Sequence, residues 1–214
     1  MNIFRGTVLA ALALSVGAYA QPNGTIDHYF QVRYAANLNV GDSVINITNS
    51  GARGAGLAAG TTAGTTGAIC VNVYAFSPDE QMISCCSCPV TPNGLVSLSA
   101  RQDLISNTLT PAVPTSIVVK LLATVPNGGS CSSSAATPAD STLARGMLAF
   151  GTTVHAPATA GSDSAITETR FAAATLSAGE LGRLQSLCTF INANGSGFGI
   201  CRSCRLGGLA GGRL

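Results

Sequence analysis

Apolar and polar side chains alternate along residues 29–38 (YFQVRYAANL), the first clearly patterned segment of the chain. Phe30, Val32 and Tyr34 fall on one face of an extended chain, whereas Gln31 and Arg33 fall on the other. A period of two residues is typical of a strand that is buried on one face. We therefore predict a β-strand here, with the three apolar side chains on its buried face.

Short apolar runs separated by turn residues follow along most of the remaining chain and predict further strands. Proline marks two of the turns, at residues 77–80 (SPDE) and 91–94 (TPNG). Residues 101–110 favour neither a strand nor a helix. The predicted strands cover residues 44–48, 70–76, 81–90, 95–99, 116–125, 146–155 and 165–176.

One helix is predicted late in the chain. Ser177 and Glu180 have the spacing of a capping box, and Asn194-Gly195 ends the apolar run that follows. That run has helical spacing and consists of Leu181, Leu184, Leu187, Cys188 and Ile191. We expect this stripe to pack on a sheet, with Cys188 as a covalent tie. The predicted fold class is mainly β: an antiparallel, immunoglobulin-like β-sandwich with one late α-helix, stabilised by disulfides.

The first 20 residues (MNIFRGTVLAALALSVGAYA) have the three parts of a cleavable secretory signal. Arg5 precedes an apolar run over residues 8–16, and small residues end at Ala20, so we expect Gln21 to begin the mature chain. The alternative is a membrane anchor, but this run is shorter than the roughly 20 residues that cross a bilayer. We expect a secreted protein, extracellular or at the cell surface, with no membrane span in the mature chain.

All eight cysteines lie in the mature part of the chain, and an even number in an oxidising compartment favours a disulfide framework. Alternation along a strand places Cys86 and Cys88 on one side and Cys85 on the other, so we expect three different partners for them. The pairing itself stays open. The expected disulfide cysteines are Cys70, Cys85, Cys86, Cys88, Cys131, Cys188, Cys201 and Cys204.

Two other interpretations of the cysteines are open. Residues 85–88 (CCSC) and 201–204 (CRSC) have the spacing of two halves of a four-thiolate metal site, although such sites belong mostly to reducing compartments. Residues 201–204 also have the C-x-x-C spacing of thioredoxin-like redox motifs, but no alternating strand and helix pattern surrounds them. We favour a structural role and expect no metal.

A Gly/Ala/Thr-rich stretch, residues 51–67 (GARGAGLAAGTTAGTTG), predicts a flexible linker. The chain then divides into a signal peptide (1–20), N-terminal strands (21–50), the linker (51–67) and a disulfide-tied β-sandwich body (68–214). Every cysteine follows the linker, so no disulfide can tie the N-terminal strands to the body. These strands are a possible donor segment: Phe30, Val32 and Tyr34 would fill a groove in a neighbouring copy.

Two resemblances bear on the setting. Residues 40–51 (VGDSVINITNSG) resemble a stretch that recurs in immunoglobulin-like β-sandwich repeats of bacterial surface proteins, which implies a strand, a turn and a strand, although the strand here is shorter. Residues 69–99 and 175–208 are similar to an uncharacterised family of secreted acidobacterial proteins, over most of residues 38–209. That resemblance implies secretion and a fixed cysteine framework, and it implies no catalytic residue.

The chemistry-bearing residues are few. A net charge of +2, with 9% charged residues, provides no basic surface for nucleic acid. Residues 41–43 (Gly-Asp-Ser) resemble the nucleophile block of GDSL-type hydrolases, but Thr152 stands where that family has an Asp before its histidine, here His155. The other histidine is His28, and no G-x-S-x-G elbow is present. We expect no catalytic residue and no cofactor.

These observations favour a non-enzymatic extracellular structural protein, a filament or surface-layer subunit whose partners are copies of itself and not nucleic acid. Assembly by N-terminal strand donation is the sharpest form of this hypothesis. The alternative is a monomeric secreted adhesin or ligand-binding module, and a secreted hydrolase is the least favoured class.

Overall fold

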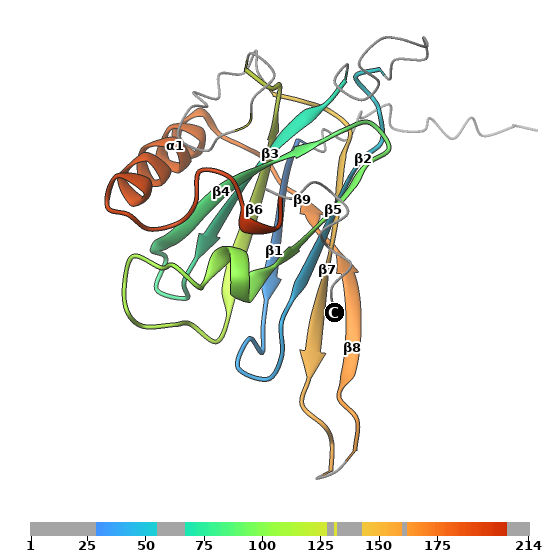
Figure 1. Ribbon diagram of the computed structural model, residues 1–214, viewed down its shortest axis with the longest axis vertical. Coiled ribbons are helices and arrows are strands. Elements are labelled where there is room, and N and C mark those ends of the chain that lie inside the picture. Colours follow the sequence, from blue (N-terminus) through green and yellow to red (C-terminus); the bar gives the residue numbers. More distant parts are fainter. Residues whose placement is uncertain (1–28, 55–66, 128–130, 132–142, 160–161, 205–214) are drawn as a thin grey trace, which may run out of the picture.

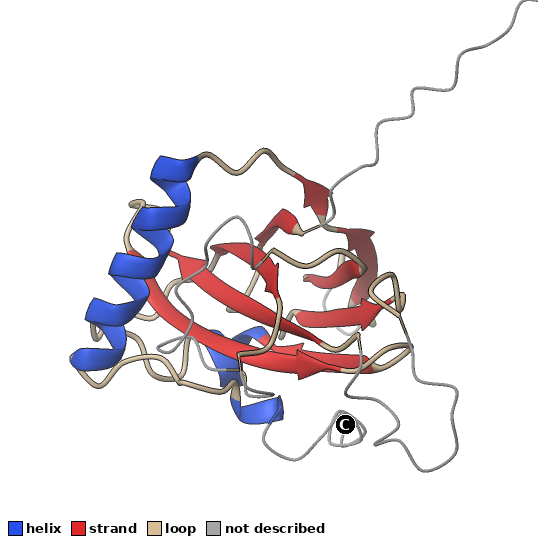
Figure 2. Cartoon of the chain, turned by 90° about the horizontal axis from the view of Figure 1, so that it is seen from above, coloured by secondary structure: helices blue, strands red, loops and turns tan. Residues whose placement is uncertain are grey.

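The computed structural model describes residues 29–54, 67–127, 131, 143–159 and 162–204 (Figure 1). These residues form two antiparallel β-sheets, one of five strands and one of four, with an α-helix packed beside the larger sheet (Figure 2). The predicted mainly-β class with one late α-helix and disulfides is confirmed at this level. The expected signal peptide, Gln21 and His28 lie outside the described residues, as do residues 55–66 of the expected linker.

Each segment predicted as a strand contains one. Sheet A contains β4 (Met82–Val90), β3 (Ile69–Phe76), β6 (Ile117–Thr124), β1 (Phe30–Ala35) and β9 (Ala172–Ala173), in this spatial order. Sheet B contains β5 (Leu95–Ser99), β2 (Val44–Asn49), β7 (Met147–His155) and β8 (Ala165–Arg170). The single strand predicted over residues 165–176 is two strands: at the buried Phe171 the chain leaves sheet B and continues as β9 in sheet A.

The main core lies between the two sheets. Because side chains alternate across a strand, every second residue of the inner strands β2, β3 and β6 points into this space. The strands of both sheets contribute large apolar residues, among them Ile45, Ile47, Val71, Val73, Ile117, Val119, Leu121 and Met147. Burial of this kind stabilises the fold by roughly 1.5–3 kcal/mol per large side chain.

A second core covers the outer face of sheet A, under α1 (Ala178–Ala193). Ser177 caps the helix by accepting a hydrogen bond from the backbone N–H of Glu180 at 3.1 Å, and Asn194 ends it, as predicted. The Glu180 carboxylate pairs with Lys120 of β6 at 2.5 Å, which fixes the start of the helix over the sheet. The buried helix residues are Leu181, Leu184, Cys188 and Ile191.

Residues 101–110, which had no clear preference, begin with a π-helical turn, η1 (Ala100–Leu104). Ser99 caps this turn by accepting from the backbone N–H of Gln102. A short 3-10 turn, η3 (Arg202–Cys204), ends the described chain. None of the helices among the described residues is long and apolar enough to cross a membrane.

Candidate functional site

All eight cysteines form disulfides, and no free cysteine remains. Their Cα–Cα separations of 4.9 to 5.7 Å are ordinary for such bonds. The disulfide framework favoured by the sequence is therefore confirmed. The pairs, which the sequence left open, are Cys70–Cys131, Cys85–Cys188, Cys86–Cys201 and Cys88–Cys204.

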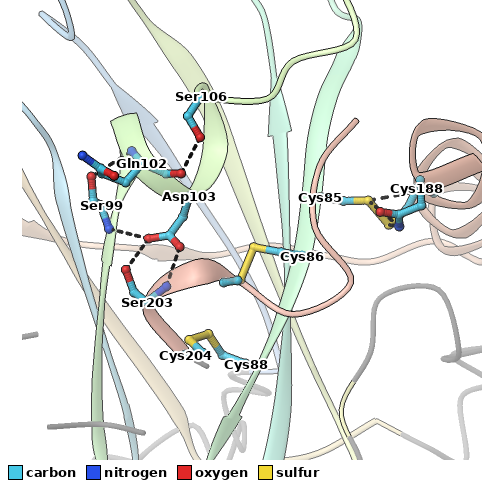
Figure 3. The surroundings of a disulfide bond; sticks show 12 residues. Cys85, Cys86, Cys88, Ser99, Gln102, Asp103, Ser106, Cys188, Ser203 and Cys204 are labelled. Atoms are coloured by element: carbon cyan, nitrogen blue, oxygen red, sulfur yellow. Dashed lines mark hydrogen bonds between the residues drawn. A yellow bond between two sulfur atoms is a disulfide. The ribbon is translucent and has the colours of Figure 1, made fainter. Parts of the chain in front are cut away.

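Strand β4 distributes its three cysteines to two sides of sheet A, as strand alternation predicts (Figure 3). Cys85 points outward and ties the sheet to Cys188 of α1. Cys86 and Cys88 belong to the main core and bond to the C-terminal residues Cys201 and Cys204. The expectation of three different partners is confirmed.

The C-terminal segment closes the open side of the sandwich beside β4. The backbone N–H of Phe198 donates to the carbonyl of Cys85, and that of Cys201 donates to the carbonyl of Ser87, so this segment pairs with the free edge of the strand. The buried carboxylate of Asp103 in η1 accepts from the backbone N–H and hydroxyl of Ser203, at 2.9 and 2.6 Å (Figure 3). Two disulfides and this carboxylate thus hold the end of the described chain.

Three of the sulfurs in this region, those of Cys88, Cys201 and Cys204, lie within 4.8 Å of one another. The sequence placed these residues in a possible four-thiolate metal site. In the structure they are disulfide sulfurs, which lack the thiolate charge that zinc requires of its ligands. The geometry therefore assigns the CCSC and CRSC segments to covalent cross-linking.

Strand β1, the proposed self-assembly strand, lies inside sheet A between β6 and β9. It pairs with β6 over six residues and with β9 over two. Phe30 is 3% exposed and packs in the core under α1, Val32 is half-buried, and Tyr34 is 60% exposed. The predicted apolar face is thus buried at its start and open to solvent at Tyr34.

The polar face of β1 is buried too, which the alternation did not predict. Gln31 and Arg33 point between the sheets, because sheet B covers this face of the strand. Gln31 donates to the carbonyl of Met147 at 2.8 Å. Arg33 donates to the hydroxyls of Thr153 and Thr169, at 2.8 and 3.1 Å.

Arg33 is a largely buried cation whose hydrogen bonds go to hydroxyl groups, including Ser43 at 3.4 Å. Burial lowers the pKa of Arg33 from its usual value, and the charge of Glu168 opposes this shift. Gly151 makes room for it, since a Cβ there would lie 2.7 Å from a guanidinium nitrogen. Arg33 therefore ties β1 to the β2, β7 and β8 side of the sandwich.

Strand β2 has an equally central place in sheet B, between β5 and β7. Ile45 and Ile47 are fully buried in the main core. At the end of the strand, the buried Asn49 amide donates to the carbonyls of Gly67 and Val90, each at 3.0 Å. The N-terminal segment therefore supplies an interior strand to both sheets. This interior position of β2 was not predicted, although the alternation of residues 44–47 (Val-Ile-Asn-Ile) was a signal of it.

The residues that resemble a hydrolase site have structural partners. The hydroxyl of the buried Ser43 donates to the carbonyl of Thr152 at 2.5 Å. Asp42 accepts from the hydroxyl of Ser99 and from the backbone N–H of Arg101. The exposed ring of His155 lies 2.9 Å from the hydroxyl of Thr167, through Nε2. These contacts hold the start of β2 and the tip of the β7–β8 hairpin.

The last strand of sheet B, β8, is exposed along all six residues, and the β7–β8 hairpin extends beyond the other strands (Figure 1). Glu168 and Arg170 carry charge along it, and Ile166 is 66% exposed. Charged side chains on an edge strand disfavour unplanned pairing with other chains.

No protein family model, curated protein or solved structure matches the chain.

Proposed function

We propose that this protein is a non-enzymatic extracellular structural protein, a subunit of a filament or surface layer. In this proposal, copies assemble when the N-terminal strand of one completes sheet A of the next. One observation carries the proposal: β1 is an interior strand of sheet A, yet it belongs to a segment that no disulfide ties to the body.

The contacts of β1 suit a donated strand. Backbone pairing along six residues of β6 would provide most of the binding free energy of the donated strand, and Phe30 would fill an apolar site under α1. A body closed by four disulfides keeps its shape while such a groove is empty. The same residues make the same contacts whether the strand comes from its own chain or from a neighbour.

The setting is part of the proposal. Four disulfides fit an oxidising compartment, and the expected signal peptide fits secretion. The resemblance of residues 40–51 to surface-protein repeats supports an immunoglobulin-like character for the sandwich. Low charge supports copies of the same chain, in preference to nucleic acid, as partners. The structural partners of Ser43 and Asp42 support a non-enzymatic role.

The test is the assembly state of the mature protein, residues 21–214, produced in an oxidising compartment. Light scattering after size exclusion, over a wide concentration range, should show oligomers, and electron microscopy should show fibres or sheets with a regular repeat. A strictly monomeric protein at high concentration contradicts the proposal and favours the solitary adhesin or ligand-binding module.

A deletion variant separates donation from other contacts. Removing residues 21–38 should give a monomer whose open groove binds a synthetic peptide of residues 29–38, with a scrambled peptide as the control. If the deleted protein forms the same polymer as the intact one, the assembly does not use β1.

A further inference from the structure

We infer that the unit exchanged between copies is β1 and β2 together, and that the chain opens between Gly54 and Gly67. This inference rests on the proposed function and names the segment that it uses. Its basis is the position of the contacts: those of β1, β2 and the connection between them are made within this pair of strands or with residues from Gly67 onward, so exchange of the pair requires only the connection after β2 to open.

The connection from β1 to β2 is held by several contacts. Asn37 adopts a left-handed backbone (φ 58°), accepts from the backbone N–H groups of Val40 and Gly41, and donates its side-chain amide to the carbonyl of Val154. The backbone N–H of Leu38 donates to Thr115, and its carbonyl accepts from Arg101.

Moving β1 alone to a neighbour would require this connection to extend. The buried side chain of Leu38 would leave the core, and the turn at Asn37 would be lost. Gly41 lies so close to Val154 that a Cβ there would be 2.7 Å from it, so the turn is also closely packed. Moving β1 and β2 together keeps each of these contacts, because their partners lie either within this unit or after residue 67.

The strand pairings show the same division. β1 pairs with β6 and β9, and β2 pairs with β5 and β7. β1 and β2 lie in different sheets and are not paired with each other (Figure 1). Every strand partner of this unit therefore belongs to the body, and a neighbour's body offers the same partners.

The connection after β2 begins and ends at residues that lie against each other. Its described ends meet: a Cβ on Gly67 would lie 1.7 Å from the carbonyl oxygen of Gly54, and Arg53 donates to the carbonyl of Ala68 at 2.8 Å. Gly54 and Gly67 both have positive φ, 100° and 80°. Thirteen residue steps separate Gly54 from Gly67 in the sequence, and a chain of that length spans at most roughly 43–47 Å. Opening here leaves the pairings of both strands intact.

The experiment places an engineered disulfide on each strand of the unit in the full mature chain. Tyr34→Cys with Val118→Cys joins β1 to β6, and Thr48→Cys with Leu95→Cys joins β2 to β5. Both are pairs without mutual backbone hydrogen bonds, where Cα atoms lie about 4.5 Å apart, near enough for a disulfide.

Val154→Cys with Ile166→Cys, between β7 and β8, is the matched control, because both of its strands belong to the body. Each variant is assembled, oxidised and run on a denaturing gel without reductant. Peptide mapping verifies that the four native disulfides are in place.

The inference expects ladders of covalent dimers and higher species from both test variants, and single chains from the control. Oligomers with a ladder only from the β1–β6 variant would mean that β1 moves alone, which overturns the inference and leaves the proposed function standing. Oligomers with single chains from both test variants would mean assembly without exchange, which overturns the inference and the donation step. Absence of oligomers overturns the proposed function itself.

Discussion

Three of the disulfides should stabilise the protein in the reverse order of their sequence separation: removing the disulfide with the longest separation should cost the least free energy of unfolding. Cys88–Cys204 spans 116 residues and Cys70–Cys131 spans 61. A disulfide stabilises a protein mainly by restricting the unfolded chain, and the restriction grows with the loop that it closes. Sequence separation alone would make Cys88–Cys204 the stronger bond, at about 5 kcal/mol.

The pattern of bonds changes this estimate. With Cys86–Cys201 in place, Cys88 and Cys204 are already joined by a path of about five residues, so their bond adds only about 2 kcal/mol. Cys85–Cys188 closes a path of about 14 residues by the same reasoning and adds about 3 kcal/mol. Cys70–Cys131 has no such shortcut and adds about 4 kcal/mol.

Three double Cys→Ala variants test this order, one for each of these disulfides. Their free energies of unfolding are measured by guanidinium titration without reductant, at a concentration where the chain is monomeric. Each variant loses two sulfur atoms, so the cost of the cavities is similar and the differences report loop closure. If loss of Cys88–Cys204 costs as much as loss of Cys70–Cys131, the argument from nested loops is wrong.

Three further changes test separate parts of the structure. Burial raises the pKa of Tyr74, so the unfolded chain loses the phenol proton first, and the free energy of unfolding falls as pH rises above about 10. In unfolding titrations at pH 9 to 11, Tyr74→Phe should remove this fall, which amounts to at most about 1.4 kcal/mol per pH unit. In Asp103→Asn, the amide NH₂ would face N–H donors that the carboxylate now accepts from, and the loss should cost roughly 1.5–3 kcal/mol in the free energy of chemical unfolding. An unchanged unfolding midpoint would contradict these hydrogen bonds. Gly67→Ala should raise the oligomer fraction measured by light scattering, because its Cβ would meet Gly54. Gly54→Ala should raise that fraction less, because its Cβ would meet nothing within 4 Å. Equal effects of the two variants would contradict the proposed opening point.

The positions of the strands and the helix could be predicted because their signals are local. Period-two alternation located β1, short apolar runs between turn residues located the other strands, and Ser177 with Gly195 delimited α1. The division of Cys85 from Cys86 and Cys88 followed from strand alternation alone. Each of these inferences needs only the residues of one segment.

What could not be predicted depends on contacts between distant segments. The polar face of β1 is buried because sheet B covers it, and nothing within residues 29–38 indicates that Arg33 would find Thr153 and Thr169 there. The division of residues 165–176 into two strands depends on Phe171 entering the core. The disulfide pairing likewise follows from the fold, since eight cysteines allow 105 pairings.

The distribution of covalent ties limits how copies can be joined. The four disulfides connect residues 70 to 204 into one cross-linked network, whereas β1 and β2 precede the first cysteine and lie outside every closed loop. An exchange of this unit after oxidation therefore breaks no covalent bond. Each copy then has one unit to donate and one pair of gaps to accept it, at β6 and β9 in sheet A and at β5 and β7 in sheet B. One donor and one acceptor per copy join chains head to tail, and such contacts extend as a linear polymer unless the rotation between copies closes a ring.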